Sequence, residues 1–168
     1  MPRQITMADG RVVEVECLSC ALTSGLIVPA GGVIYESGNF HIHQDVAYPI
    51  TGLVIIASKR HFYCMDELTQ EEQSEYIALI HKVRSEQRTR LDIEKVYYFY
   101  NEDTTHHFHL WMVPRYEWMN QFGYSVESLR PVLLHARNRM NNEENNRQVI
   151  EGISKLKKGL KGFLNNSK

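Results

Sequence analysis

The chain has 168 residues and a mass of 19.6 kDa, which is the size of one compact domain and leaves no room for a second full one. Hydrophobic residues make up 43% of it and charged residues 23%, which excludes disordered, collagen-like and coiled-coil chains. With 19 Lys and Arg residues against 20 Asp and Glu residues, the formal net charge is -1. A protein this close to neutral has no global field that attracts nucleic acid or an acidic membrane, so we expect neither as a partner.

Targeting signals and cysteine usage both indicate a cytoplasmic protein. No apolar run follows Arg3, as a secretory signal would require. Residues 17–35 are uncharged, but glycines, hydroxyl residues and Pro29 interrupt them, which argues against a membrane span. The three cysteines, an odd and small number, suit a reducing compartment better than a disulfide-linked secreted fold.

The first third of the chain has short β-rich runs separated by turn residues. Two extended runs are joined through residues 37–39, Ser-Gly-Asn, which is typical of a hairpin. A further run is apolar and β-branched, as in a strand that is buried on both faces. The strands predicted here are Val12–Val15, Val33–Glu36, Phe40–Val46 and Gly52–Ala57.

A helix and a second hairpin follow. Thr69 and Glu72 have the spacing of a capping box, and apolar residues then recur at helical intervals, which predicts a helix over residues 70–88. Lys95–Asn101 and His107–Val113 predict two antiparallel strands, and Pro114 should end the second because proline has no ladder donor.

The last third of the chain is helical in pattern, with a polar linker at residues 140–146 and a final amphipathic helix. Strands grouped ahead of these helices, with one helix among them, indicate an α+β fold with a twisted antiparallel sheet and helices packed on one face. We expect a single domain over residues 1–168, with its core at about 12–115 and a C-terminal helical extension at about 125–165.

The most informative segment is the predicted strand at residues 107–113. Alternate side chains share a face of a strand, so His107, His109 and Trp111 point one way. The apolar residues between them point the other way and can pack under the helix of residues 70–88. The imidazoles are then left to line an open pocket.

Followed by Pro114-Arg115, this segment resembles the signature of the histidine triad family, which has three histidines at alternate positions of a strand and then two apolar residues, Pro and Arg. His107 and His109 occupy the first and second triad positions, and Trp111 occupies the third. The resemblance extends from about Cys17 to Arg115. It implies a homodimer, because relatives of this kind are commonly dimeric.

The resemblance also implies an activity, in which the middle histidine, His109, attacks the α-phosphate of a nucleotide. A neutral imidazole has a nucleophilic nitrogen at pH 7, and a covalent nucleotidyl-histidine intermediate divides a difficult displacement into two steps. The expected function is that of a hydrolase or transferase that cleaves a nucleotide phosphoanhydride or phosphoramidate, such as a dinucleoside polyphosphate. No organic cofactor is required.

Substrate contacts are expected around the same hairpin. Phosphoryl oxygens that gain charge need fixed donors, and the nearest candidates are His107, Asn101, Thr104 and Thr105. The resemblance assigns Asp45 to a ribose hydroxyl, for which a carboxylate is a suitable acceptor.

Trp111 is the departure from the family pattern. Indole has one N–H donor and no basic nitrogen, so it cannot serve as a proton donor to the leaving group. Trp111 either covers one end of the sheet or stacks on a base or ligand.

Cys17 and Cys20 form a C-x-x-C motif, to which zinc would need two further N or S ligands. Some histidine triad proteins complete such a site with the histidine after the buried strand and the first triad histidine, here His61 and His107. We therefore expect structural zinc, with two buried thiols as the alternative. A His107 that binds zinc cannot also donate freely to phosphate, and its part in catalysis is then positional.

Two other functions remain open at this point. The chain could be a nucleotide-binding or regulatory module whose triad is degenerate at Trp111 and which does not turn its ligand over. It could also be a metal-dependent hydrolase with His41, His43 and Asp45 as ligands.

Overall fold

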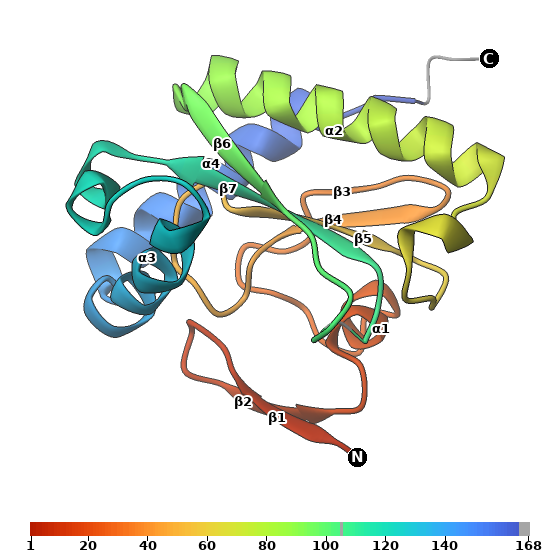
Figure 1. Ribbon diagram of the computed structural model, residues 1–168, viewed down its shortest axis with the longest axis horizontal. Helices are drawn as coiled ribbons and strands as arrows, with labels where there is room; N and C mark the ends of the chain where they lie inside the picture. Colours follow the sequence, from red (N-terminus) through yellow and green to blue (C-terminus); the bar gives the residue numbers. More distant parts are fainter. Residues whose placement is uncertain (105, 165–168) are drawn as a thin grey trace.

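The protein is described here by a computed structural model that covers residues 1–104 and 106–164 (Figure 1). Its centre is a five-stranded antiparallel sheet with the strand order β3-β4-β5-β7-β6, and the hairpin β1-β2 is a separate two-stranded sheet. The strands are β1 (Arg3–Thr6), β2 (Val12–Val15), β3 (Tyr35–Glu36), β4 (Phe40–Gln44), β5 (Val54–Ser58), β6 (Lys95–Phe99) and β7 (His109–Arg115).

The predicted strands are all present, although their ends differ by a few residues. The run at 33–36 forms only the two-residue strand β3. Strand β1 was not predicted, because its residues Arg-Gln-Ile-Thr have one apolar side chain and no alternating pattern. Strand β5 is buried along its whole length, as expected for a strand with apolar side chains on both faces.

Both ends of β7 differ from the prediction. The expectation that Pro114 ends the strand is wrong, because β7 continues to Arg115. Strand β5 pairs with β7 only as far as Met112, and Pro114 lies beyond that point, opposite Val96 of β6. A proline is tolerated where one side of the strand has no neighbour that needs its N–H. At its other end β7 begins at His109, so His107 lies just ahead of the strand.

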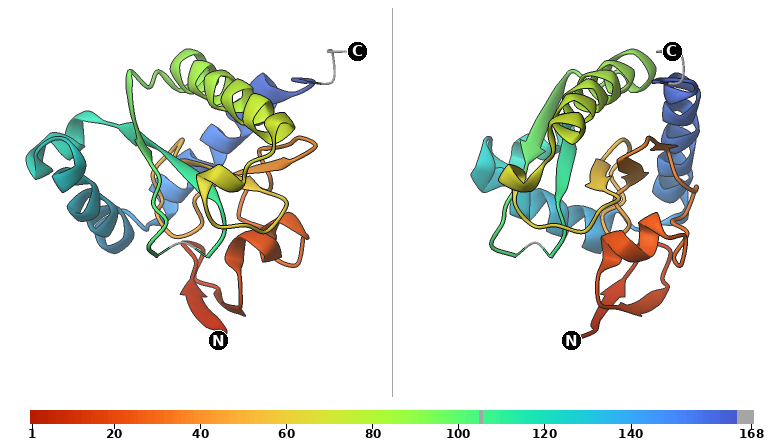
Figure 2. Two further views of the ribbon diagram at one scale, coloured as in Figure 1. Left: turned by 45° about the vertical axis from the view of Figure 1, so that its right-hand side comes forward. Right: turned by 90° about the vertical axis from the view of Figure 1, so that its right-hand side faces the viewer.

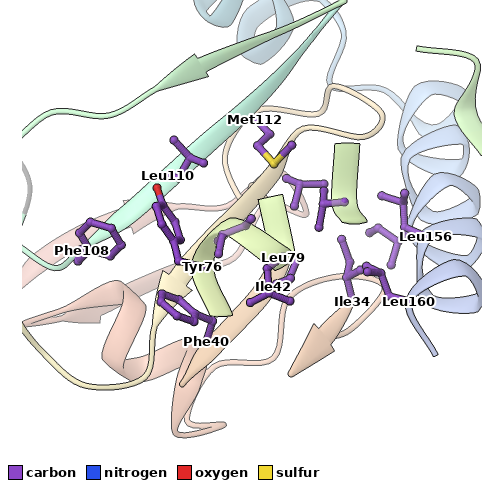
Figure 3. Packing of buried hydrophobic residues seen from close by; sticks show 14 of the residues in the cluster. Ile34, Phe40, Ile42, Tyr76, Leu79, Phe108, Leu110, Met112, Leu156 and Leu160 are labelled. Atoms are coloured by element: carbon purple, nitrogen blue, oxygen red, sulfur yellow. The ribbon is translucent and has the colours of Figure 1, made fainter. Parts of the chain in front are cut away.

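Two long helices cover one face of the sheet. Helix α2 (Gln70–Leu91) begins at the predicted capping box, in which the Thr69 hydroxyl accepts from the Glu72 N–H and the Glu72 carboxylate accepts from the Thr69 N–H. Helix α4 (Glu143–Leu160) packs against α2 and the same core. Figure 3 shows how their side chains meet those of the sheet: Ile42, Leu110 and Met112 from the strands, Tyr76 and Leu79 from α2, and Leu156 and Leu160 from α4.

Helix α3 (Val126–Arg139) lies on the opposite face, although all helices were expected on one face. In the right-hand view of Figure 2, α2 is above the central strands and α3 is below them. The reason is the doubly apolar strand β5, because Ile55 and Ala57 point away from α2 and need their own cover. An apolar stripe on α3 provides it: Leu129, Val132, Leu133 and Ala136.

Short elements close the ends of the sheet. Helix α1 (Leu18–Thr23) and the β1-β2 hairpin form a small third core with Val46 and lie together below the sheet in Figure 1. Two 3₁₀ helices, η1 (Met65–Glu67) and η2 (Glu117–Phe122), precede α2 and α3. Within the described residues, no helix combines the length and apolar character that crossing a membrane requires.

Candidate active site

A cavity of about 380 Å³ opens on the face of the sheet that α2 does not cover, between the N-terminal hairpin, α1 and the end of α3. This volume is in the usual range for small-ligand sites. The structure brings most of the predicted substrate and catalytic residues to its wall: Asp45, Asn101, Thr104, His107, His109 and Trp111. The remaining predicted contact, Thr105, lies outside the described residues.

The His109 ring has one protonated nitrogen and one nitrogen with a free lone pair. Its Nδ1 lies 2.8 Å from the carbonyl oxygen of His107, and a carbonyl only accepts, so Nδ1 bears the proton and Nε2 keeps its lone pair. Burial lowers the pKa of His109, the hydrogen bond to His107 opposes this, and the positive charge of Arg3 lowers it further. The ring is therefore neutral at pH 7.

His107 has both of its ring nitrogens engaged. Its Nε2 lies 2.6 Å from the carbonyl oxygen of Ser58 and donates to it. Its Nδ1 therefore has the lone pair, and it faces the sulfur atoms of Cys17 and Cys20, each 3.4 Å away. The side chain has no nitrogen left for a phosphate, so of the two roles expected for His107 the geometry favours the positional one.

Cys17, Cys20, His61 and His107 form a compact group whose four ligand atoms all lie within 4.8 Å of one another. The Cys20 sulfur is 3.0 Å from Nδ1 of His61, and the Nδ1 atoms of the two histidines are 3.2 Å apart. A tetrahedral ion with bonds of about 2.0 to 2.3 Å has ligand atoms roughly 3.3 to 3.8 Å apart, close to this spacing. Two sulfurs and two imidazoles directed at one point are a suitable donor set for a metal ion.

The alternative metal set is not supported. His41 and His43 point from β4 to the same face of the sheet, but Asp45 lies beyond the end of that strand. Its Oδ1 accepts from the backbone N–H groups of Ala47 and Tyr48, each at 2.8 Å. Among the residues that the structure describes, these three do not form a group able to hold a metal ion, so the hypothesis of a hydrolase built on them loses its geometric basis.

Asp45 has one carboxylate oxygen held by backbone N–H groups. Because Oδ1 is occupied by Ala47 and Tyr48, Oδ2 is the oxygen that can serve the cavity. Burial raises the pKa of Asp45 to about 6, although the two backbone N–H groups and the charge of Arg137 lower it. A ligand hydroxyl that donates to Oδ2 would stabilise the ionised form.

Asn101 and Thr104 hold the turn at the mouth of the cavity. The Oδ1 atom of Asn101 accepts from the Thr104 hydroxyl at 3.0 Å and from the Thr104 N–H at 3.4 Å. The two residues therefore shape the turn through each other while they line the cavity.

Nothing in the sequence indicated Arg3, Tyr48 or Arg137 as residues of the cavity wall, and it indicated His43 only as a metal ligand. The Arg137 guanidinium lies 4.4 Å above the ring of Tyr48, whose centroid is 5.8 Å from that of Trp111. No local pattern could have identified Arg3 or Arg137, since each comes from an element that packs beside the sheet only in the folded chain. Trp111 packs against Tyr48 and also lines the cavity.

Solved structures of histidine triad proteins have a similar fold. A hypothetical histidine triad nucleotide-binding protein from Sulfolobus tokodaii strain7 is 17% identical, with a TM-score of 0.63 over 90% of this chain and 99% of that one. A Zn-bound histidine triad family protein from Mycobacterium smegmatis is 22% identical, with a TM-score of 0.58 over 85% and 96%. A Hit-like protein involved in cell-cycle regulation from Bartonella henselae is 15% identical, with a TM-score of 0.61 over 86% and 96%.

No protein-family model and no curated protein matches the sequence. At such low identities, the structural likeness establishes the fold and leaves the activity to be argued from the site. The α+β architecture expected from the sequence is confirmed, and the chain has the histidine triad fold.

Proposed function

We propose that this protein is a nucleotidyl hydrolase or transferase that cleaves a phosphoanhydride or phosphoramidate through a nucleotide held covalently on His109. The main support is the state of that ring: the His107 carbonyl fixes the proton on Nδ1, and Nε2 is left with its lone pair beside a cavity of about 380 Å³. The similar structure from Sulfolobus tokodaii is described as a nucleotide-binding protein, which agrees with this reading.

The first step forms a bond between Nε2 of His109 and the α-phosphorus of the substrate. The bond from phosphorus to the leaving oxygen or nitrogen breaks, and its electron pair departs with the leaving group. Arg3 and Arg137 line the cavity and are available to phosphoryl oxygens, and Oδ2 of Asp45 is available to a ribose hydroxyl. In the second step, water or another acceptor attacks the phosphorus and frees His109.

We also propose that Cys17, Cys20, His61 and His107 hold a structural zinc ion. The donor set and the lone pair that Ser58 fixes on Nδ1 of His107 support this, and a similar structure is described as Zn-bound. Four protein ligands leave no open position, so the ion would supply no chemistry and would only clamp α1 to the segment ahead of β7. The backbone carbonyl of His107 would then stay in place to orient His109.

A second candidate is a module that binds a nucleotide without turning it over. Trp111 favours it, because the third triad position has no basic nitrogen. The two candidates share the cavity and differ only in whether phosphorus is transferred to His109.

Mass spectrometry of protein quenched during turnover separates them. The substrates are adenosine 5′-phosphoramidate and a dinucleoside polyphosphate, and the matched variant is His109→Ala. The enzyme gives product and an adduct whose mass maps to His109, and the variant gives neither. The module gives affinity for both ligands without product. Product formed by His109→Ala at the wild-type rate would refute the covalent route.

A further inference from the structure

The active site needs a proton donor that the triad positions do not supply. The amine that leaves from a phosphoramidate must gain a proton as its bond to phosphorus breaks, whereas the phosphate that leaves from a phosphoanhydride is a stable anion. Trp111 has no basic nitrogen, and both nitrogens of His107 are engaged. The other described histidines at the cavity are His43 and His106, of which His106 is an exposed residue of the 100–108 turn.

His43 occupies the same row of the sheet as Trp111. In the registers of β4, β5 and β7, His43 pairs with Ile55, and Ile55 pairs with Trp111. In the next row, His41 pairs with Ala57, and Ala57 pairs with His109. Because these residues all point to one face, His43 lines the cavity from the strand two positions away from β7.

His43 is joined to a second buried imidazole. The Nδ1 atoms of His41 and His43 are 3.2 Å apart, and the side chains are 0% and 3% exposed. A hydrogen bond between two ring nitrogens requires one N–H and one lone pair, so one ring has its proton on Nδ1 and the other on Nε2. A neutral pair of this kind can pass a proton from one end to the other.

The His41 end of the pair lies close to Glu36, whose side chain is partly exposed. Nε2 of His41 is buried, makes no hydrogen bond within the described residues, and lies 3.6 Å from a carboxylate oxygen of Glu36. The Glu36 side chain is 47% exposed and also lies 3.6 Å from Lys59. One water, or a small rotation of Glu36, is enough to join this carboxylate to His41.

We propose that His43 is the general acid of this active site and that His41 and Glu36 return its proton from solvent. This inference rests on the proposed function and deepens it. As the bond from phosphorus to the leaving group breaks, the leaving atom takes the electron pair and a proton from Nε2 of His43. Nδ1 of His43 accepts the Nδ1 proton of His41, and Nε2 of His41 accepts a proton that solvent delivers through the protonated form of Glu36. When water attacks the phosphorus in the second step, Nε2 of His43 takes a proton from it and the relay runs in reverse, which restores both rings.

The surroundings of His43 agree with this role. Burial and the neighbouring rings of His41 and His109 lower the pKa of His43 to about 3, so the empty site keeps the ring neutral. A neutral ring can still donate its Nε2 proton, because Nδ1 receives another from His41 in the same step.

Two substrates with one nucleotide and different leaving groups test the proposal. The nitrogen of adenosine 5′-phosphoramidate must be protonated as it departs as ammonia. The 4-nitrophenyl ester of AMP instead releases an anion that needs no proton. For His43→Gln we expect kcat to fall about 10²-fold or more on the first substrate and less than about 10-fold on the second. His41→Gln should show the same pattern with a smaller loss, and the exposed control His81→Gln should leave both rates unchanged.

Equal losses on the two substrates would overturn the proposal, because they would make His43 a packing residue. A selective loss in His106→Gln in place of His43→Gln would overturn it as well and move the role to the turn. If His43→Gln does not fold, the wild-type rate across a series of leaving groups serves instead: a shallow dependence on leaving-group pKa supports a general acid and a steep one refutes it. These outcomes differ from a failure of the proposed function itself. In that case the wild type would give neither product nor an adduct on His109.

Discussion

The two faces of the central sheet come from the same strands but serve different purposes. On the α2 side, β4, β5 and β7 contribute aliphatic and aromatic residues that pack against two helices. On the other side the same strands contribute His41, His43, His109 and Trp111, and only part of this face is covered by α3. A strand alternates its side chains with a period of two, so a rigid packed face can hold a reactive face in position.

The largest effect is expected at the nucleophile. His109→Ala removes the proposed nucleophile, so kcat should fall by at least about 10³-fold, or about 4 kcal/mol of transition-state stabilisation. The free energy of unfolding should change little, because the residue belongs to the reactive face. Initial rates and urea unfolding of this variant and His81→Ala measure both quantities. A His109→Ala enzyme within 10-fold of wild type would contradict the assignment.

A substitution on the packed face is expected to lower stability and to leave substrate binding unchanged. Leu79 is fully buried between α2 and the sheet, and Leu79→Ala should lower the free energy of unfolding by about 2 to 4 kcal/mol through lost burial and a residual cavity. KM should stay the same, since the substituted face does not meet the cavity. Urea unfolding and steady-state kinetics give the two numbers, and Ile77→Ala, on the exposed side of the same helix, is the control. A changed KM with unchanged stability would show that the faces are not separate.

Removal of the metal should have an intermediate effect. A zinc ion that binds only the folded state stabilises it by about 2.7 kcal/mol when free zinc is 100 times its Kd, so a chelator should lower stability by roughly that amount. Cys17→Ser should copurify without zinc and be as stable as the chelated wild type. Metal analysis and thermal unfolding of the wild type, Cys17→Ser and the control Cys64→Ser measure this. Equal zinc in all three proteins would exclude the proposed ligand set.

The smallest effect should be a pH-dependent one at Asp45. Its pKa is about 6 in the folded protein, above the ordinary value of 3.8, because burial outweighs the N–H groups of Ala47 and Tyr48 and the charge of Arg137. A carboxyl with a raised pKa stabilises the fold fully below pH 3.8 and loses that contribution as the pH rises through 6. Asp45→Asn should therefore become more stable relative to wild type between pH 4 and 7, by about 1 to 2 kcal/mol.

Urea unfolding at several pH values tests this expectation, with the exposed Asp66→Asn as the control. The same Asp45 variant should also bind a ribonucleotide more weakly, because an amide is a poorer acceptor for a hydroxyl than a carboxylate. A stability difference that does not vary with pH would show that Asp45 is not desolvated in solution.

Local sequence patterns were sufficient to predict most of the strands, helix α2 and the polarity of the two faces of β7. The capping box at Thr69 and Glu72 placed the start of α2, and the alternation of residues 107–113 correctly separated His109 and Trp111 from Phe108 and Leu110. Such features depend on residues within a few positions of each other, so they are visible before the chain folds.

Tertiary structure alone decided which of these residues meet. Pro114 remains within β7 because β5 stops pairing at Met112, and α3 crosses to the second face because β5 is apolar on both sides. Likewise, His43 lies in the row of Trp111 only because of the register between β4, β5 and β7, and Arg137 reaches the cavity from α3. Strand register and helix placement depend on the apolar surface that distant segments bury together. A short stretch of sequence does not determine that burial.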